Sequence, residues 1–286
     1  MSALMEAVKN LAEEAFSPAG KSYLKISLSA VRSLSSRFSC HLKDVEKCAL
    51  SVGIIPERYQ RNLGSIGGAE GQLLLLDSRV AVIGLGGLGG LAAELLARMG
   101  VGTIVLVDGD IFSENNLNRQ VLSTEDNLGQ KKAEAAQKRI AAINAAVETV
   151  VFTEMAQEQN IEEMLQGCRA VLDCLDNIKT RFLLQKTCQK LGIPMIHGAI
   201  AQFYGQVSTI FPEDVGLKAI YSSFNDQQDK GIEAQLGNPA ATPALIAAWQ
   251  VQEAVKVLLK IGEPLKNRLL FIDTLQGSCE TIELGN

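Results

Sequence analysis

The chain has 286 residues, of which 47% are hydrophobic, so it is long enough to bury a sizeable core in one large α/β domain or in a domain with an appendage. A formal net charge of −5 argues against a surface that coats nucleic acid. The six cysteines form no CxxC pair, and no apolar run approaches the roughly 20 residues of a membrane span. We therefore expect a cytoplasmic protein with reduced thiols and no membrane partner.

The first 56 residues differ in pattern from the rest of the chain. Apolar residues recur at helical spacing over 5–16 and again over 45–52. Asp44 is the expected N-cap of the second helix, and Gly53 is its expected stop. We expect residues 1–56 to form a small helical extension and residues 57–286 to form the main domain.

A glycine-rich turn follows the first strand of that domain. Residues 80–83 are apolar and predict a buried strand, and Gly84-x-Gly86-x-x-Gly89 then leads into a predicted helix over 88–99. Glycines at such a turn let phosphates approach the unpaired N–H groups of the helix. The pattern predicts a nucleotide site but does not identify the nucleotide.

Beyond the turn, the pattern alternates between strand and helix, which predicts a parallel sheet. The next strand, 103–107, ends at Asp108, where an acidic residue normally binds a ribose hydroxyl. The further expected strands are 147–153, 170–174, 194–197, 206–211, 269–273 and 280–284. The further expected helices are 128–144, 161–165, one that is capped by Asp176-Asn177 and ends at Leu191, and 242–259 with Thr242 as its N-cap.

No helix is expected between strands 194–197 and 206–211. We therefore predict a Rossmann-like α/β fold whose largely parallel sheet turns mixed toward the C-terminus, with helices on both faces. Residues 203–241 have weak periodicity and a polar centre, which is typical of a mobile loop over an active site.

Three polar clusters come at the carboxyl ends of predicted strands or at the start of a helix, where open α/β sheets bind ligands. They contain Arg119, Lys132 and Asp176, respectively. Taken singly, Arg119 is an ordinary charge in a loop, Lys132 is a solvated residue in the first turn of a helix, and Asp176 is a helix cap. Together they suit a triphosphate with Mg²⁺ better than a nicotinamide, because triphosphate cleavage needs cations at the leaving group and a carboxylate for the metal.

From about Arg58 to Asp273 the chain resembles the ThiF/MoeB/HesA family of ubiquitin-activating-like (E1-like) adenylyltransferases. In that family, ATP activates the C-terminal Gly-Gly carboxylate of a small ubiquitin-like protein as an acyl-adenylate, and pyrophosphate is released. The matching segments are Arg58-Tyr-Gln-Arg61, Val82-Ile-Gly-Leu-Gly-Gly-Leu-Gly89, Val107-Asp-Gly-Asp110, Asn116-Leu-Asn-Arg-Gln120, Gly129-Gln-Lys-Lys132, Asp173-Cys-Leu-Asp-Asn177 and His197-Gly-Ala-Ile200.

The resemblance implies a role for each matching residue. Arg119, Lys132 and Asp176 would be catalytic, with Lys132 stabilising the α-phosphate and the leaving group and Asp176 holding Mg²⁺ beside Asn177. Arg61 would reach into the ATP site of a partner subunit, which implies a homodimer. The remaining residues implied to bind the nucleotide are Gly84, Gly86, Gly87 and Gly89 in the turn, Asp108 at the ribose, and Asn116 and Gln120 with Arg119 near the phosphates.

The chain departs from the family pattern at its cysteines. Many relatives hold a structural Zn²⁺ with two CxxC pairs, which are absent here, so we expect no zinc. No cysteine lies between Cys188 and Cys279, so the loop before the last helix has no nucleophile. We expect Cys174 and Cys188 to be packed in the core, and His197 to order a strand end.

These inferences together predict an adenylyltransferase that uses ATP and Mg²⁺ to activate a ThiS- or MoaD-type sulfur carrier and leaves sulfur transfer to another protein. Adenylation of a small-molecule or tRNA-borne carboxylate is the alternative within the same fold. An NAD-dependent oxidoreductase is disfavoured by Arg119 and Lys132. A non-catalytic module that binds a ubiquitin-like partner is disfavoured by the intact set of Arg119, Lys132 and Asp176.

Overall fold

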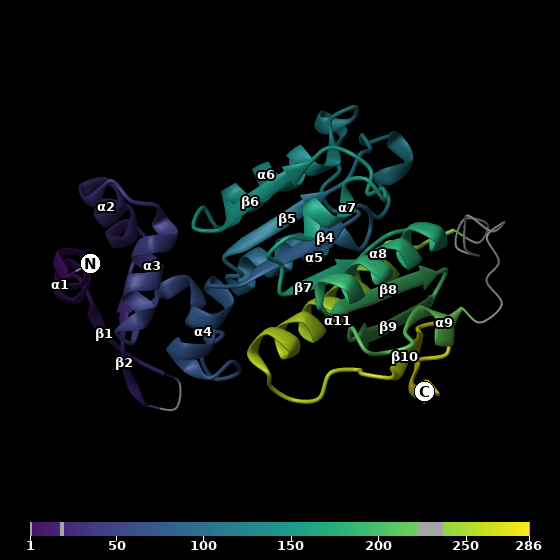
Figure 1. Ribbon diagram of the computed structural model, residues 1–286. Helices are drawn as coiled ribbons and strands as arrows, with labels where there is room; N and C mark the ends of the chain where they lie inside the picture. Colours follow the sequence, from purple (N-terminus) through teal and green to yellow (C-terminus); the bar gives the residue numbers. More distant parts are fainter. Residues whose placement is uncertain (1, 18–19, 222–236, 286) are drawn as a thin grey trace.

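The computed structural model describes residues 2–17, 20–221 and 237–285, and its main body is built on an eight-stranded sheet (Figure 1). The central strands are almost wholly buried, as expected for apolar runs covered on both faces. In sheet order the strands are β11 (Ser278–Glu283), β10 (Arg268–Asp273), β9 (Tyr204–Ile210), β8 (Met195–Ala201), β7 (Ala170–Asp173), β4 (Arg79–Ile83), β5 (Thr103–Val107) and β6 (Glu148–Phe152).

The pairing of the strands changes from parallel to antiparallel at β8. Each neighbouring pair from β8 through β7, β4 and β5 to β6 is parallel. The pairs β8–β9, β9–β10 and β10–β11 are antiparallel. The expectation of a largely parallel sheet that turns mixed toward the C-terminus is therefore confirmed.

Helices cover both faces of the sheet, as predicted. Val80 and Val82 of β4 belong to a core cluster with α5 (Gly89–Met99), α6 (Lys132–Ile143) and α11 (Ala241–Leu259). The alternate residues of β4 and β5 face a second cluster with α7 (Ile161–Leu165) and α8 (Ile178–Leu191). The shorter helices are η1 (Glu57–Tyr59), α4 (Gly68–Leu76), η2 (Glu114–Asn116), η3 (Glu125–Asn127) and α9 (Leu217–Ile220).

Three expected helix starts differ from the structure. The helix expected from 128 begins at Lys132, because the preceding residues form η3 and a turn at Gly129, whose φ is +81°. Thr242 is not the N-cap of α11, since its hydroxyl donates instead to the carbonyl of Gln202 at 2.8 Å. Asn177 alone caps α8, accepting from the N–H of Thr180 at 2.9 Å.

The N-terminal unit, residues 2–56, contains strands as well as helices. The prediction of one helix over 5–16 is wrong beyond Asn10, because residues 13–16 pair with a second strand and this pairing overrides the local helical spacing. Asp44 is the third residue of its helix, where it completes a capping box with the true N-cap, His41. The elements are α1 (Ser2–Asn10), β1 (Glu13–Phe16), β2 (Ser22–Ile26), α2 (Leu28–Phe38), α3 (Leu42–Ser51) and β3 (Ile54–Pro56).

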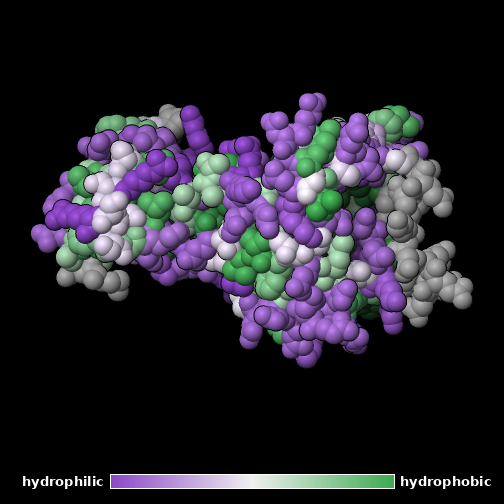
Figure 2. Space-filling view, turned by 90° about the horizontal axis from the view of Figure 1, so that it is seen from above, coloured by the Kyte–Doolittle hydropathy of each residue, from purple (hydrophilic) through white to green (hydrophobic). Residues whose placement is uncertain are grey.

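This unit is a separate lobe joined to the rest by a narrower neck (Figure 2). Buried hydrogen bonds cross the neck: the hydroxyl of Tyr59 donates to Glu46 of α3 at 2.9 Å, and the amide of Asn144, after α6, donates to Tyr59 at 2.9 Å. Arg58 pairs with Glu46 at 3.3 Å. Burial raises the pKa of the Glu46 carboxyl, and the charge of Arg58 opposes that rise.

Residues 203–241, expected to be a mobile loop, include two described elements. β9 and α9 occupy part of the segment, and residues 222–236 lie outside the described part. In the ranges that the structure describes, no helix combines the length and the apolarity needed to cross a membrane.

Replacing Asn144 with alanine tests the neck. The side-chain amide of Asn144 also donates to the carbonyl of Ala97 at 3.0 Å, so its removal leaves several buried polar groups without partners. We expect the Asn144→Ala variant to lose about 2 kcal/mol or more of unfolding free energy in urea denaturation. Gln137→Ala, which removes an exposed amide from α6, should change it by less than about 0.5 kcal/mol, and equal losses in the two variants would contradict this account.

Candidate functional site

The carboxyl ends of β4, β5 and β7 lie side by side, because Ile83 of β4 is in register with both Val107 and Asp173. Gly84 follows at once, with a φ of +88°, and its N–H donates to the carbonyl of Val107 at 2.9 Å. A Cβ atom on Gly84 would lie 2.7 Å from the carbonyl oxygen of Cys174, and one on Gly89 would lie 1.8 Å from the carbonyl oxygen of Gly84. The turn itself therefore requires these two glycines.

The two glycines between them are not required by such contacts. A Cβ on Gly86 would have its nearest neighbour, the amide of Gln120, at 3.6 Å, which is an ordinary contact. A Cβ on Gly87 would lie 3.6 Å from Cγ of Arg119 and closer, at 3.2 Å, to Pro243. Gly86 and Gly87 therefore form the open part of the turn, with Gln120 and Arg119 beside them.

Asp108 and Gln120 place polar groups beside the same turn. The two carboxylate oxygens of buried Asp108 accept from the N–H groups of Leu85, at 2.7 Å, and Asp110, at 2.8 Å. The side-chain oxygen of Gln120 is buried and has no hydrogen-bond partner in the described part of the chain. A buried polar atom without a partner is costly, so a ligand donor at this point would complete the site.

Three of the predicted residues lie on the polar segments that follow β5. Lys132, at the start of α6, is only 6% exposed, and its ammonium lies 3.0 Å from the carboxylate of Asp110. Arg119 is partly buried, and its guanidinium donates to the carbonyl of Asn115 at 2.9 Å. The side chain of Asn116 is used locally, since it accepts from the N–H of Ser113 at 3.0 Å in a capping box of η2.

Asp176, Asn177 and Arg61 are not in contact with these residues in any interaction found among the described residues. Asp176 is exposed in the turn after β7, and Asn177 caps α8. Arg61 is exposed just after Tyr59, which contacts Gly100 and Asn144 at the amino ends of the strands. Within one chain, Arg61 therefore lies toward the opposite edge of the sheet from the glycine turn.

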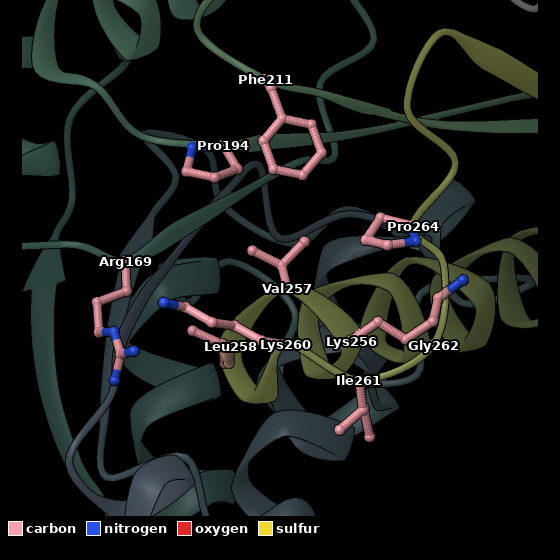
Figure 3. Close-up of a pocket in the computed structure, with 10 residues that line it drawn as sticks. All are labelled: Arg169, Pro194, Phe211, Lys256, Val257, Leu258, Lys260, Ile261, Gly262 and Pro264. Atoms are coloured by element: carbon pink, nitrogen blue, oxygen red, sulfur yellow. The ribbon is translucent and has the colours of Figure 1, made fainter.

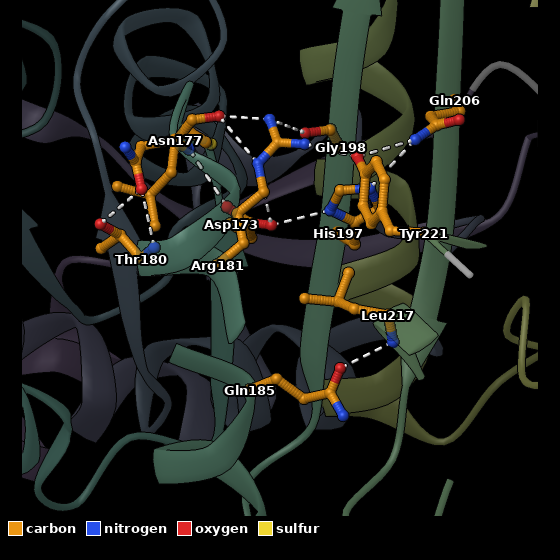
Figure 4. Close-up of polar contacts among 12 residues, drawn as sticks. Asp173, Asn177, Thr180, Arg181, Gln185, His197, Gly198, Gln206, Leu217 and Tyr221 are labelled. Atoms are coloured by element: carbon orange, nitrogen blue, oxygen red, sulfur yellow. Dashed lines mark hydrogen bonds and ion pairs between the residues drawn. The ribbon is translucent and has the colours of Figure 1, made fainter. Parts of the chain in front are cut away.

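A buried polar network lies beside the Asp176 turn, between β7, β8 and α8 (Figure 4). Nδ1 of His197 donates to Asp173 at 2.7 Å, and Nε2 lies 3.2 Å from the hydroxyl of Tyr221 and 3.3 Å from the amide of Gln206. Burial lowers the pKa of His197, and the hydrogen bond to Asp173 opposes that shift. His197 thus links the carboxyl end of β7 to the neighbouring part of β8 and orders that strand end, as expected.

Arg181 completes this network. Its Nε donates to the carbonyl of Leu175 at 3.2 Å, and its Nη1 donates to the hydroxyl of Tyr221 at 2.7 Å. Arg181, Gln206 and Tyr221 were not predicted from the sequence. A signal was present for Arg181, because Arg181, Gln185 and Gln189 recur at intervals of four along the predicted helix and form a polar stripe.

The two cysteines near the site are packed in the core, as expected. Cys174 and Cys188 are both buried, and burial raises the pKa of each thiol well above its ordinary value. Both are therefore protonated at neutral pH, and neither has the exposed, electropositive setting of a reactive thiolate.

A pocket of about 470 Å³ lies elsewhere, where β7 and β8 begin (Figure 3). Arg169 and Pro194, which line it, come directly before those strands, and Lys260 follows α11. None of the predicted site residues lines this pocket. It therefore belongs to the edge of the sheet opposite the glycine turn.

The chain is similar to several known proteins. The "SAMP-activating enzyme E1" of Haloferax volcanii is 37% identical over 227 residues, covering 79% of this chain and 84% of its own. The "Sulfur carrier protein adenylyltransferase" of Thermus thermophilus is 35% identical over 240 residues, covering 78% and 84%. A crystal structure of PaaA has the same fold, with a TM-score of 0.69, 23% identity, and coverage of 80% of this chain and 82% of its own.

The family comparison extends over most of the chain. Residues 59–286 match the ThiF family, a range that includes the glycine turn, Asp108, Lys132 and the Asp176 turn. The chain therefore belongs to the ThiF family.

Proposed function

We propose that the chain is an adenylyltransferase that uses ATP to activate the C-terminal Gly-Gly carboxylate of a small ubiquitin-like sulfur carrier. The observation that carries the proposal is the convergence of an open glycine turn, buried Asp108 and buried Lys132 at the carboxyl edge of β4 and β5. The Thermus thermophilus relative is named as an adenylyltransferase of a sulfur carrier protein, which favours a protein carrier over a small-molecule or tRNA-borne carboxylate.

The residues at the turn fit ATP. Gly86 and Gly87 leave the backbone open to phosphate oxygens, and Gly84 and Gly89 hold the turn that aims the N–H groups of α5 at them. Asp108 keeps unused lone pairs on both carboxylate oxygens, which a ribose hydroxyl can occupy. The side-chain nitrogen of Gln120 lies beside Gly86, and its unpartnered oxygen would accept from a donor on the nucleotide.

Charge placement supports attack at the α-phosphorus. In this reaction a carboxylate oxygen of the carrier bonds to the α-phosphorus, and the bond to the β-phosphate oxygen breaks, so negative charge grows on departing pyrophosphate. Lys132 and Arg119 supply positive charge, with Asn116 shaping the loop that carries Arg119. Cations aimed at developing charge in a desolvated site are a large source of catalysis.

Asp176 is proposed to hold Mg²⁺, with Asn177 beside it. The described residues contain no group of three His, Cys, Asp or Glu side chains that could hold a metal alone. Mg²⁺ commonly takes one or two protein carboxylates and completes its shell with substrate phosphates and water. The exposed carboxylate of Asp176 fits that pattern, and bound Mg²⁺ would neutralise phosphate charge.

We further propose that residues 57–286 are the adenylation domain, residues 1–56 an extension, and the active form a cytoplasmic homodimer. Arg61 supports the homodimer, because it is exposed and follows Tyr59, which lies toward the edge of the sheet opposite the glycine turn of its own chain. The absence of CxxC pairs from the sequence supports a domain without structural zinc.

Carrier-dependent exchange of labelled pyrophosphate into ATP tests the activity. We expect exchange with Mg²⁺ and a carrier that ends in Gly-Gly, and a loss of about 100- to 1,000-fold in Lys132→Met because a cation is removed from the leaving group. Lys138→Met, an exposed position on the same helix, should keep full exchange. No exchange with any carrier in a panel, despite measurable ATP binding, would falsify the proposal.

Gly86→Ala tests whether the open part of the turn holds phosphate. The added methyl group makes only ordinary contacts in the protein, so we expect the unfolding free energy to change by less than about 0.5 kcal/mol. ATP affinity, measured by calorimetry, should fall about tenfold or more, because the methyl group occupies the phosphate's place. Gly64→Ala, with nothing within 4 Å, is the matched control. Unchanged ATP affinity in Gly86→Ala would show that the phosphates bind elsewhere.

A further inference from the structure

Helix α8 carries a polar stripe that binds the segment after β9. Its three residues, Arg181, Gln185 and Gln189, recur at intervals of four, so they project from one side of the helix. Each donates to or accepts from a different part of residues 214–221. The contacts are Gln189 Nε2 to the carbonyl of Asp214 at 3.1 Å, the N–H of Leu217 to Gln185 Oε1 at 2.7 Å, and Arg181 Nη1 to the hydroxyl of Tyr221 at 2.7 Å.

Arg181 is the member of the stripe that also reaches the Asp176 turn. Its Nε and Nη2 both donate to the carbonyl of Leu175, and the N–H of Leu175 donates to Asp173 at 3.1 Å. That carbonyl belongs to the peptide group that joins Leu175 to Asp176. The guanidinium therefore fixes the peptide plane from which the Asp176 side chain departs, and Figure 4 shows these bonds converging on Arg181.

The burial of these charges is costly unless each is paired. Arg181 is 3% exposed and Asp173 is fully buried, with Nε of the arginine 3.8 Å from the carboxylate. Desolvating two such ions costs several kcal/mol each, and their attraction repays this only with good geometry and further hydrogen bonds. An apolar pair would avoid this cost, but it could not donate to the Leu175 carbonyl.

We propose that Arg181 is a positioning residue that fixes the carboxylate of Asp176 for a divalent cation. The inference rests on the proposed function, since it assumes that Asp176 meets a metal and nucleotide. Arg181 itself touches neither. It acts through the Leu175–Asp176 peptide, and Tyr221 and Asp173 hold the guanidinium in place.

Binding of Mn²⁺ to the protein–ATP complex, followed by electron paramagnetic resonance of the free ion, tests this without turnover. In Arg181→Lys the charge beside Asp173 is kept, but a single nitrogen replaces the three guanidinium nitrogens that donate to Leu175 and Tyr221. We expect Mn²⁺ affinity to fall about tenfold or more, as for other residues that orient a metal ligand. ATP affinity without metal should stay within about twofold, since the glycine turn and Lys132 are untouched.

Gln189→Ala is the matched control, because it shortens the same stripe at its far end. It should lower the melting temperature without changing Mn²⁺ affinity. If Arg181→Lys does not fold, Tyr221→Phe removes one bond of the guanidinium and should weaken Mn²⁺ binding in the same direction.

The outcomes separate the two proposals. A lowered melting temperature with unchanged Mn²⁺ affinity in the folded variants would overturn the role of Arg181 alone. Failure of the unaltered protein to bind ATP would instead overturn the proposed function.

Discussion

The site depends on the parallel pairing of β4 with β5 on one side and with β7 on the other. This pairing places Gly84, Asp108 and Cys174 directly after neighbouring strand ends. A shift of either register by one residue would turn the buried side chains to the opposite face and separate these ends. Everything that follows, from the glycine turn to the Asp176 turn, takes its position from that alignment.

Two kinds of polar group lie at this edge, and they differ in whether their hydrogen-bonding capacity is already used by neighbouring residues. Asp108 is buried and bonds the N–H of Leu85 in the turn, and Lys132 is buried beside Asp110 just after β5, so both keep further hydrogen-bonding capacity that a nucleotide can use. Asp173 and His197 are fully buried and bond each other and their neighbours. The first pair suits binding and charge stabilisation, whereas the second maintains the geometry of the strand ends.

Much of this arrangement could be predicted from local sequence. Glycine spacing, apolar runs and the acids after them specify the turn and the central strands, because each depends on neighbours in the chain. The strand Glu13–Phe16 could not be predicted in this way, because it forms only by pairing with β2. Arg181 was missed for a similar reason: the polar stripe to which it belongs is visible in the sequence, but its partners, Leu175 and Tyr221, are brought together only by the packing of α8.

The central claim is that this edge of the sheet joins a carboxylate to the α-phosphorus of ATP. Carrier prepared with a heavy oxygen isotope in its C-terminal carboxylate tests it most directly. After reaction with ATP and capture by hydroxylamine, the carbonyl–oxygen bond breaks and the bridging oxygen leaves with the nucleotide. The account predicts the isotope in AMP. Isotope found in inorganic phosphate, with ADP as the nucleotide product, would show attack at the γ-phosphorus and contradict it.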